Sequence, residues 1–421
     1  MFRQAARTCL VAAFALALHA QEGNTPKGIP HLDHVFVIVM ENHSFGQVVG
    51  NPNMPFTNKY IKEANYGTNY FAVGHPSLTN YLEIVGGSNF GVRTDNAPDW
   101  HNNACTPNLA NGAVSTDTPA SGPICPIYGA GTDAATPIID FTNETSGAPG
   151  EIDVDGKLGY AANSHTVGMT IADQLANRNM TWKSYQESLP PTGPNGVNVA
   201  DGFFSNLDNL ATALPGEGMT QANLVALYAV KHNPFAYFAS VQEGLDPKLS
   251  FKSMVGFEGP HGLFADLANG HVPAYSLIAP NQCNDQHGRG NAGPACQYDP
   301  NDNGTLVGLN PALMYQGDAT LRSLVTAIHQ SKVWNNGRTA IITVWDENDY
   351  SISPTTNKVL VIVDTNYGRH GVKSNNFYTH FSLLKSVEAG LELPCLNHAC
   401  DSATQVMSDL FAEGHPGDNQ R

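Results

Sequence analysis

Short, continuous apolar runs that end abruptly in polar side chains dominate the hydrophobic pattern of the chain. Three of them cover residues 34–40, 274–279 and 338–345 and are rich in Val, Ile and other β-forming residues. A continuous apolar run of this length is typical of a strand that is covered on both faces, as in a parallel sheet. We predict further strands at 235–241 and 358–364.

Helical periodicity alternates with these runs along the chain. We predict helices at 171–179, 318–330 and 380–391, and a shorter one whose apolar face ends at Gly86 and Gly87. Alternating strands and helices indicate βαβ units, and hence an α/β fold built on a mostly parallel sheet. Because the alternation runs from start to finish, we expect residues 21–421 to form a single domain.

Within that domain, the region 88–165 departs from the alternating pattern. It is rich in Gly, Pro, Asn, Thr and Asp and has weak periodicity. Long stretches without regular structure are usually functional or disordered. We therefore predict a loop-rich insertion that lies near the site.

Acidic and amide side chains follow the first and last of the three apolar runs. Glu41 and Asn42 come after the first, and Asp346 and Glu347 come after the last. Open α/β sheets place their sites beyond the carboxyl ends of strands. Carboxylate and amide oxygens suit Mg, Ca or Mn, and a carboxylate also serves Zn. Adjacent carboxylates repel unless a cation or proton lies between them, so we predict a metal site; the alternatives are a helix N-cap and a solvated turn.

Two other segments carry side chains suited to catalysis. Ser77 stands where a loop leads into the short helix, with its hydroxyl in the positive N-terminal field that also attracts phosphate. A metal that lowers its pKa would make it a nucleophile, whereas the alternative is a simple N-cap. Asp285 and His287 follow the middle run, and histidine either ligates a metal or moves protons near neutrality.

The N-terminal segment indicates where the protein is located, and the charge of the chain argues against some partners. Residues 1–20 join a basic start to an apolar run and an Ala-rich end, which is typical of a cleaved signal peptide, so we expect a secreted or periplasmic protein. No stretch approaches the ~20 apolar residues of a membrane span. The formal net charge is −16 and no basic patch is visible, which argues against nucleic-acid binding.

Seven cysteines are present, and Cys9 would leave with the signal peptide. An even number in an exported protein fits disulfides, and no Cys-x-x-Cys pair supports a zinc site. Pairing of nearest neighbours gives three loops: Cys105–Cys125, Cys283–Cys296 and Cys395–Cys400.

Five ordered motifs together resemble the bacterial phosphoesterase family of secreted acid phosphatases and phospholipases C, within the alkaline phosphatase superfamily. They are Glu-Asn-His-Ser-Phe at 41–45, His-Pro-Ser-x-x-Asn-Tyr-Leu at 75–82, Pro-Asn-x-x-x-Asp-x-His at 280–287, Trp-Asp-Glu at 345–347 and His-Phe-Ser-Leu-Leu at 380–384. The resemblance implies a doubly wound α/β core and metal-assisted hydrolysis of phosphate esters through a hydroxyl nucleophile.

The same resemblance implies roles for individual residues of the five motifs. The metal ligands would be Glu41, Asn42, Asp346 and Glu347; the nucleophile Ser77, with Thr79 as its rival; the leaving-group or second-metal residues Asp285 and His287; and the phosphate contacts Asn80, His75 and His380. A complete second set of metal ligands is not evident, so the number and identity of the divalent ions stay open.

The sequence thus predicts a secreted, metal-dependent phosphomonoesterase that works through a phosphoserine intermediate. Its substrate would be a small phosphorylated molecule or a phosphoinositide headgroup. The alternative is a phospholipase C that cleaves phosphodiesters of lipids. Phospholipase members commonly carry extra C-terminal domains, and the short segment after the motif at 380–384 favours the monoesterase. A binding protein that has kept the fold without turnover is disfavoured because all the proposed ligands are present.

Overall fold

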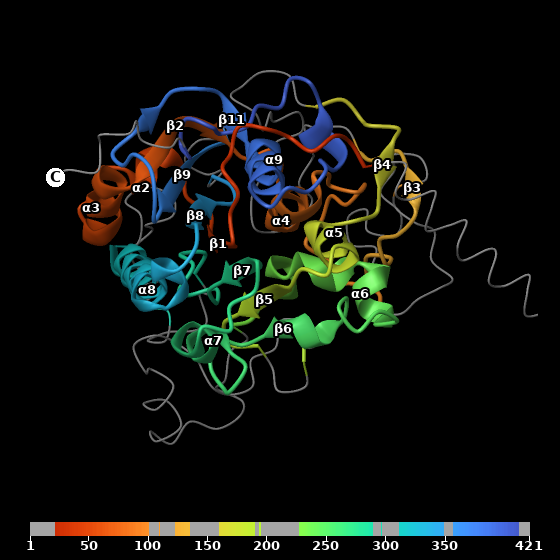
Figure 1. Cartoon of the computed structure of the whole chain (residues 1–421), viewed down its shortest axis with the longest axis horizontal. Helices are drawn as coiled ribbons and strands as arrows, with labels where there is room; N and C mark the ends of the chain where they lie inside the picture. Colours follow the sequence, from red (N-terminus) through yellow and green to blue (C-terminus); the bar gives the residue numbers. More distant parts are fainter. Residues whose placement is uncertain are drawn as a thin grey trace, which may run out of the picture.

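The computed structural model describes residues 22–100, 109, 123–134, 160–189, 193–194, 227–288, 296, 311–348 and 357–411. These residues form a layered α/β structure in which one large sheet lies between two groups of helices (Figure 1). The predicted signal segment and Cys105 lie outside the described residues, as does most of the region 88–165.

A nine-stranded sheet forms the centre of the fold. Its order is β10-β2-β9-β8-β1-β7-β5-β6, and β11 pairs with β2. The strands are β1 (His34–Met40), β2 (Asn65–Phe71), β5 (Trp182–Gln186), β6 (Met254–Val255), β7 (Tyr275–Ala279), β8 (Thr339–Trp345), β9 (Lys358–Thr365), β10 (Lys373–Ser374) and β11 (Tyr378–Thr379). Among these described strands, only β9 runs antiparallel to its neighbours, β8 and β2. The predicted mostly parallel sheet is therefore confirmed.

Strand β1 occupies the middle of this sheet. It pairs in parallel with β7 on one side and β8 on the other, so that Val37 lies opposite both Leu277 and Ile342. Its residues are fully buried from Val35 to Met40, because helices cover both faces. That environment explains the unbroken apolar run in the sequence. The parallel strands β1, β5, β7 and β8 end at one edge of the sheet, and their C-terminal residues meet there.

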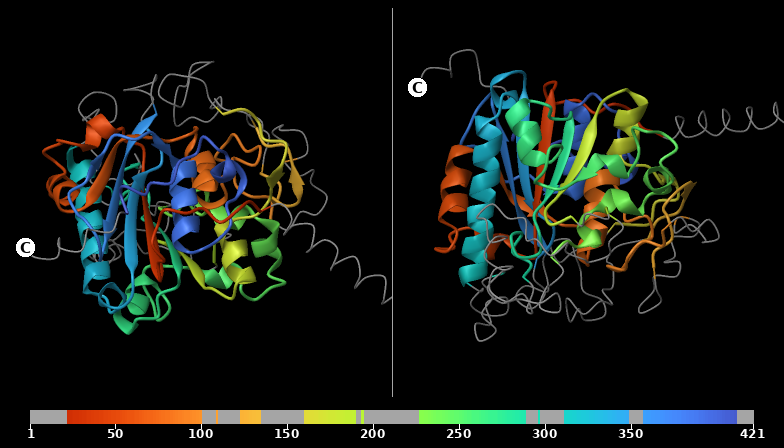
Figure 2. Two further views of the ribbon diagram at one scale, coloured as in Figure 1. Left: turned by 45° about the horizontal axis from the view of Figure 1, so that its top comes forward. Right: turned by 90° about the horizontal axis from the view of Figure 1, so that it is seen from below.

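Helices cover the sheet in two groups. Helices α3, α7 and α8 pack together on one face, and α4, α5 and α9 pack together on the other (Figure 2). Their bounds, with those of two shorter helices, are α2 (Phe45–Val48), α3 (Pro55–Glu63), α4 (Ser77–Gly86), α5 (Ile171–Asn177), α6 (Ala239–Glu243), α7 (Leu263–Asn269), α8 (Pro311–Gln330) and α9 (His380–Gly390). None of the described helices has the length and apolarity needed to cross a bilayer.

The helices predicted at 171–179, 318–330 and 380–391 are confirmed as α5, α8 and α9, and α8 begins seven residues earlier than expected. The strand predicted at 235–241 is wrong. This segment forms a 3₁₀ turn, η5 (Pro234–Tyr237), followed by α6. Pro234 opens the turn and Gly244 ends α6 in the left-handed conformation, so local turn chemistry overrides the apolar content.

Short elements and disulfides complete the described structure. The pair β3 (Ala130–Gly131) and β4 (Thr166–Val167) forms a separate two-stranded ribbon. The remaining 3₁₀ turns of the described residues are η4 (Val230–His232), η6 (Phe251–Ser253), η9 (Val333–Asn335) and η10 (Asn397–Cys400). The predicted disulfides Cys283–Cys296 and Cys395–Cys400 are confirmed. The third predicted pair includes Cys105 and thus falls outside the described residues.

One histidine ties the ribbon region to the C-terminal part of the fold. The Nε2 atom of His398 lies 3.1 Å from Asp133 Oδ2, and its Nδ1 lies 2.7 Å from Asp401 Oδ2. Asp133 also accepts hydrogen bonds from the Ser88 hydroxyl at 2.8 Å and the Asn163 backbone at 2.6 Å. Burial lowers the pKa of His398, but its bonds to the two carboxylates outweigh burial and raise the pKa to about 9.

We predict that His398→Gln destabilises the protein in a pH-dependent way. The folded-state pKa lies above the ordinary value of 6.5, so the stabilisation is complete below about pH 6.5 and is lost as the pH rises through 9. The shift corresponds to about 3 kcal/mol. Urea unfolding of both proteins between pH 6 and pH 10 measures this difference. A difference in unfolding free energy that stays constant over that range would contradict it.

Candidate active site and metal centre

Three strands deliver carboxylates to one edge of the sheet. Glu41 follows β1, Asp346 follows β8, and Asp285 follows β7 within a short loop. The backbone N–H of Glu41 donates to the carbonyl of Asp285 at 2.9 Å, and that of Asp346 donates to the carbonyl of Met40 at 2.9 Å. The sheet's hydrogen bonding thus continues one residue past the strands and fixes the backbone that carries these carboxylates.

Ser77 is the first residue of α4 and lies between two of the acids. Its hydroxyl is 3.1 Å from Glu41 Oε2 and 3.1 Å from Glu347 Oε1. Ser77 is fully buried. The hydroxyl of Thr79, the rival nucleophile, donates to the carbonyl of Pro76 at 2.8 Å. Of the two hydroxyls, only that of Ser77 is directed at the carboxylates.

Glu347 is held by side chains from the segment that precedes and begins α4. Asn80 donates from Nδ2 to Glu347 Oε2 at 3.0 Å, and the Nδ1 atom of His75 lies 2.9 Å from the same oxygen. The Oδ1 atom of Asn80 accepts the backbone N–H groups of Val73 and Gly74. The structure therefore brings Asn80 and His75 into the site, where they contact Glu347 and hold the loop before Ser77.

His232, a residue not identified from the sequence, bridges the acids of β1 and β7. Its Nε2 lies 3.1 Å from Glu41 Oε1, and its Nδ1 lies 3.4 Å from Asp285 Oδ2. The ring of Tyr81 stacks on it with centroids 5.0 Å apart. Glu41, His232 and Asp285 each offer a ligand atom within 4.8 Å of the others, and all three are buried. This donor set suits a divalent cation.

Unsatisfied oxygens next to this cluster also fit a cation. Asp346 Oδ2 and Asn42 Oδ1 are buried and have no hydrogen-bond partner among the described residues. Asn42 has φ +54°, a left-handed conformation that is uncommon for a residue other than glycine. Its backbone N–H donates to Asp346 Oδ1 at 3.1 Å. The strand tips thus bring Glu41, Asn42, Asp346 and Glu347 together, and their role as metal ligands stays a prediction.

The carboxylates strongly affect one another. Burial raises the pKa of Glu41, Asp346 and Asp285 raise it further, and Lys231 lowers it. Burial is also the main reason that the pKa of Asp285 rises to about 8 and that of Asp346 rises. Four fully buried carboxyl groups cannot all ionise side by side without a compensating cation or proton.

Asp285 holds the backbone of His287, and the His287 ring contacts two further groups. Asp285 Oδ1 accepts the backbone N–H of His287 at 2.8 Å. The ring Nδ1 lies 2.9 Å from the carbonyl of Gly288, and Nε2 lies 3.4 Å from the ammonium of Lys231. Because a carbonyl only accepts, Nδ1 carries the proton and Nε2 presents its lone pair to Lys231. The geometry therefore favours a neutral imidazole.

His380 contacts the backbone of Asp346 rather than its carboxylate. Its Nε2 donates to the backbone carbonyl of Asp346 at 2.6 Å, and its Nδ1 accepts from the hydroxyl of Tyr70 at 2.8 Å. Burial lowers the pKa of His380 to about 4, so the ring is neutral. Both nitrogens are thus engaged by the protein, and the geometry supports a role in placing Asp346.

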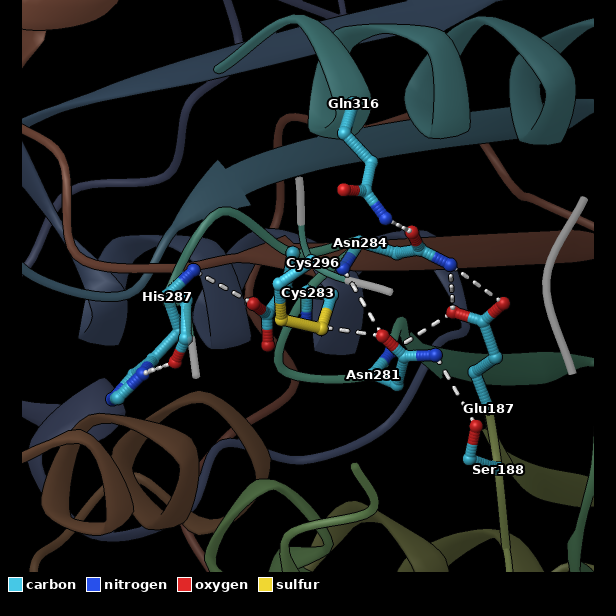
Figure 3. The surroundings of a disulfide bond; sticks show 10 residues. Glu187, Ser188, Asn281, Cys283, Asn284, His287, Cys296 and Gln316 are labelled. Carbon is cyan, nitrogen blue, oxygen red and sulfur yellow. Dashed lines mark hydrogen bonds between the residues drawn. A yellow bond between two sulfur atoms is a disulfide. The ribbon is translucent and has the colours of Figure 1, made fainter. Parts of the chain in front are cut away.

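The loop that carries Asp285 and His287 is anchored by Glu187, the residue directly after β5 (Figure 3). The buried Glu187 accepts the backbone N–H of Asn281 at 2.9 Å and the side-chain amide of Asn284 at 2.9 and 3.0 Å. Gln316 of α8 donates to Asn284 at 2.7 Å. With the disulfide Cys283–Cys296, these bonds fix the loop from several sides.

Sequence reasoning missed three polar residues of the site. They are His232, Lys231 beside the His287 ring, and Asp95, whose Oδ2 lies 2.8 Å from the Lys231 ammonium. A signal was present for two of them, since an apolar run over 224–230 ends in Lys231 and His232, as the other runs end in acids. The strand was instead predicted at 235–241, after these two residues, so they were not considered as the polar end of an apolar run. Asp95 lies in a stretch without periodicity and carried no signal.

Comparison with known proteins identifies the family. A model of the Phosphoesterase family matches residues 51–296, more than half of the chain. The chain belongs to the Phosphoesterase family. The family predicted from the five motifs is thereby confirmed, although the similar proteins include fungal as well as bacterial ones.

Individual phosphoesterases are similar over different lengths. An acid phosphatase of Aspergillus fumigatus is 24% identical over 361 residues, which cover 86% of this chain and 55% of that protein. A phosphatidylinositol-3-phosphatase of Mycobacterium tuberculosis is 30% identical over 132 residues, which cover 29% of this chain and 44% of that protein. The matched residues thus cover about half the length of each relative. A solved structure from the alkaline phosphatase superfamily of Vibrio parahaemolyticus aligns with a TM-score of 0.43 and 12% identity, over 90% of this chain and 72% of that one.

We predict that His232→Ala lowers the affinity of the protein for a divalent cation by more than about tenfold, because it removes one of three buried donors. Metal content after dialysis against Mn²⁺ or Zn²⁺, measured by mass spectrometry, and the shift in melting temperature on adding the ion test this. His165→Ala, at an exposed position, is the control. Equal metal content in the two variants would exclude His232 as a ligand.

Proposed function

We propose that this phosphoesterase is an exported phosphomonoesterase that depends on a divalent cation and uses Ser77 as its nucleophile. The observation that carries the proposal is the placement of the Ser77 hydroxyl at the start of α4, within 3.1 Å of both Glu41 and Glu347. The similarity to an acid phosphatase supports the choice of reaction. The two disulfides of the described residues support an oxidising location.

Residues of the chain account for the first chemical step. The Ser77 oxygen forms a bond to phosphorus while the bond from phosphorus to the leaving oxygen breaks. The Ser77 proton leaves along a hydrogen bond that already exists, to Glu41 or Glu347. The positive N-terminal end of α4 favours the negative charge of the phosphoryl group. The products of this step are phosphoserine and the anion of the leaving group, which takes a proton from solvent to become the alcohol.

A bound divalent cation would neutralise the buried carboxylates and lower the pKa of the serine hydroxyl. Glu41, His232 and Asp285 offer the closest donor set, and Asp346 and Asn42 offer further oxygens. Glu347 stays available to Ser77, since Asn80 and His75 already hold it in position.

His287 is suited to the second step, in which water releases phosphate. Its neutral ring has an Nε2 lone pair that accepts a proton from the attacking water, while Nδ1 stays bonded to Gly288. The water oxygen then bonds to phosphorus as the bond to the Ser77 oxygen breaks, and Ser77 regains its proton from the carboxyl group that took it in the first step. This role agrees better with the geometry than donation of a proton to the leaving group.

The substrate class is a small phosphate monoester, with phosphoinositide headgroups included. The similarity of part of the chain to a phosphatidylinositol-3-phosphatase supports that inclusion. A phospholipase C acting on phosphodiesters is the competing function. Hydrolysis of p-nitrophenyl phosphate and of p-nitrophenyl phosphorylcholine separates the two.

We predict that Ser77→Ala removes nearly all hydrolysis of p-nitrophenyl phosphate, whereas Thr79→Ala retains most of it, because the Thr79 hydroxyl is engaged by Pro76. A chelator should also abolish the activity of the wild-type protein, and added divalent ion should restore it. Initial rates with near-ultraviolet detection of nitrophenol test both statements. Loss in Thr79→Ala with retention in Ser77→Ala would show that the other hydroxyl attacks.

We predict that His287→Ala lowers steady-state turnover of p-nitrophenyl phosphate by about 10²–10⁴-fold, the usual contribution of a general base. Because the first step does not need His287, a rapid burst of nitrophenol should precede the slow phase, and phosphoserine should accumulate. Stopped-flow absorbance and mass spectrometry of the quenched protein measure both. A variant that shows no burst and loses more activity on an alkyl phosphate would point to protonation of the leaving group instead.

A further inference from the structure

Lys231 is a buried lysine inside the site. Its side chain is only 6% exposed, and its ammonium lies 2.8 Å from Asp95 Oδ2 and 3.4 Å from His287 Nε2. Burial of an ammonium is costly unless it is paired and hydrogen-bonded. Because this buried ammonium lies in the proposed active site, we infer that its positive charge has a function there.

Asp95 links this lysine to the helix of the nucleophile. Its Oδ1 accepts the backbone N–H of Leu78 at 2.9 Å, while its Oδ2 binds Lys231. Leu78 is the residue directly after Ser77 in α4. The ammonium of Lys231 and the start of α4 thus contact opposite oxygens of one carboxylate.

The field of Lys231 reaches the acids of the site. It lowers the pKa of Glu41, Asp285 and Asp346, against the larger effect of burial. The ion pair of Lys183 with Asp266 offers a contrast, because it joins β5 to α7 and lies outside the site. An ion pair that served stability alone would have no need to lie among the catalytic groups.

We propose that Lys231, positioned by Asp95, contacts the phosphoryl oxygens at Ser77 and makes the site prefer dianionic phosphate monoesters to monoanionic diesters. The proposal rests on the function proposed above and adds its specificity determinant. A dianion carries one more negative charge than a diester, and that charge interacts with the Lys231 ammonium in a water-poor site. When Lys231 turns to the phosphoryl group, the Nε2 lone pair of His287 also becomes available to water.

Anion binding tests the proposal without relying on turnover. Calorimetry at pH 8 with the metal-loaded protein compares inorganic phosphate, mostly a dianion there, with dimethyl phosphate, a monoanion. Lys231→Met should weaken phosphate binding by about tenfold or more and dimethyl phosphate binding by less, since one charge–charge interaction is lost. Lys183→Met, which removes a lysine ion pair elsewhere, should leave both affinities unchanged.

A second variant guards against misfolding, because Lys231→Met leaves the Asp95 carboxylate buried without its cation. Asp95→Asn combined with Lys231→Met removes both charges and keeps an oxygen for the Leu78 N–H. It should show the same selective loss of phosphate binding. Unchanged phosphate affinity in either folded variant would overturn the proposal, as would an equal loss for both anions or a wild-type protein that does not bind phosphate. Phosphate binding that depends on Lys231 in a protein that hydrolyses no ester would uphold it and reject the phosphatase function.

Discussion

The mutual repulsion of buried carboxylates is the constraint on which the site depends. Glu41, Asp285, Asp346 and Glu347 are fully buried at one edge of the sheet. Removing such groups from water costs several kcal/mol per ion even after relaxation. The surrounding structure compensates with histidines, one lysine, the start of α4 and backbone N–H groups. These partners come from distant parts of the chain, so the site forms only when the whole sheet and its covering helices are assembled.

The sheet supplies the rigidity that this arrangement needs. Hydrogen bonds of the ladder continue past the strands to Glu41 and Asp346, and Glu187 fixes the loop before Asp285. Carboxylates on such a frame cannot move apart to relieve their repulsion. Because the repulsion is not relieved, it increases the affinity of the site for positive charge. It also lowers the stability of the fold when no positive charge is present. A cation bound among these carboxylates would therefore stabilise the fold as well.

The strands that end in acids could be predicted from the sequence, because burial on both faces requires unbroken apolar runs. The polar residues that end these runs are then easy to recognise. It could not predict which acid meets which donor. Whether Glu347 contacts a metal or Ser77 depends on side chains 267 and 270 residues away. His232 lies in a 3₁₀ turn with no periodicity of its own, so the apolar run over 224–230 that precedes it was the only signal, and that run was not recognised. The region 88–165 has only weak periodicity, so Asp95 could not be assigned to the site from the sequence.

The net charge of the chain and the local charges at the site have opposite effects on an approaching anion. The chain has a formal net charge of −16, which repels anions at long range. At the site, α4 and Lys231 provide positive potential over a few ångströms only. Salt screens the long-range repulsion within about 10 Å at 0.1 M, whereas the buried contacts are screened much less. An anionic membrane surface would be repelled by the negative protein surface over a wide area. A small soluble phosphate ester would be repelled only while it approaches the site. For the phosphomonoesterase proposed above, this charge distribution favours small soluble esters over headgroups held in an anionic bilayer.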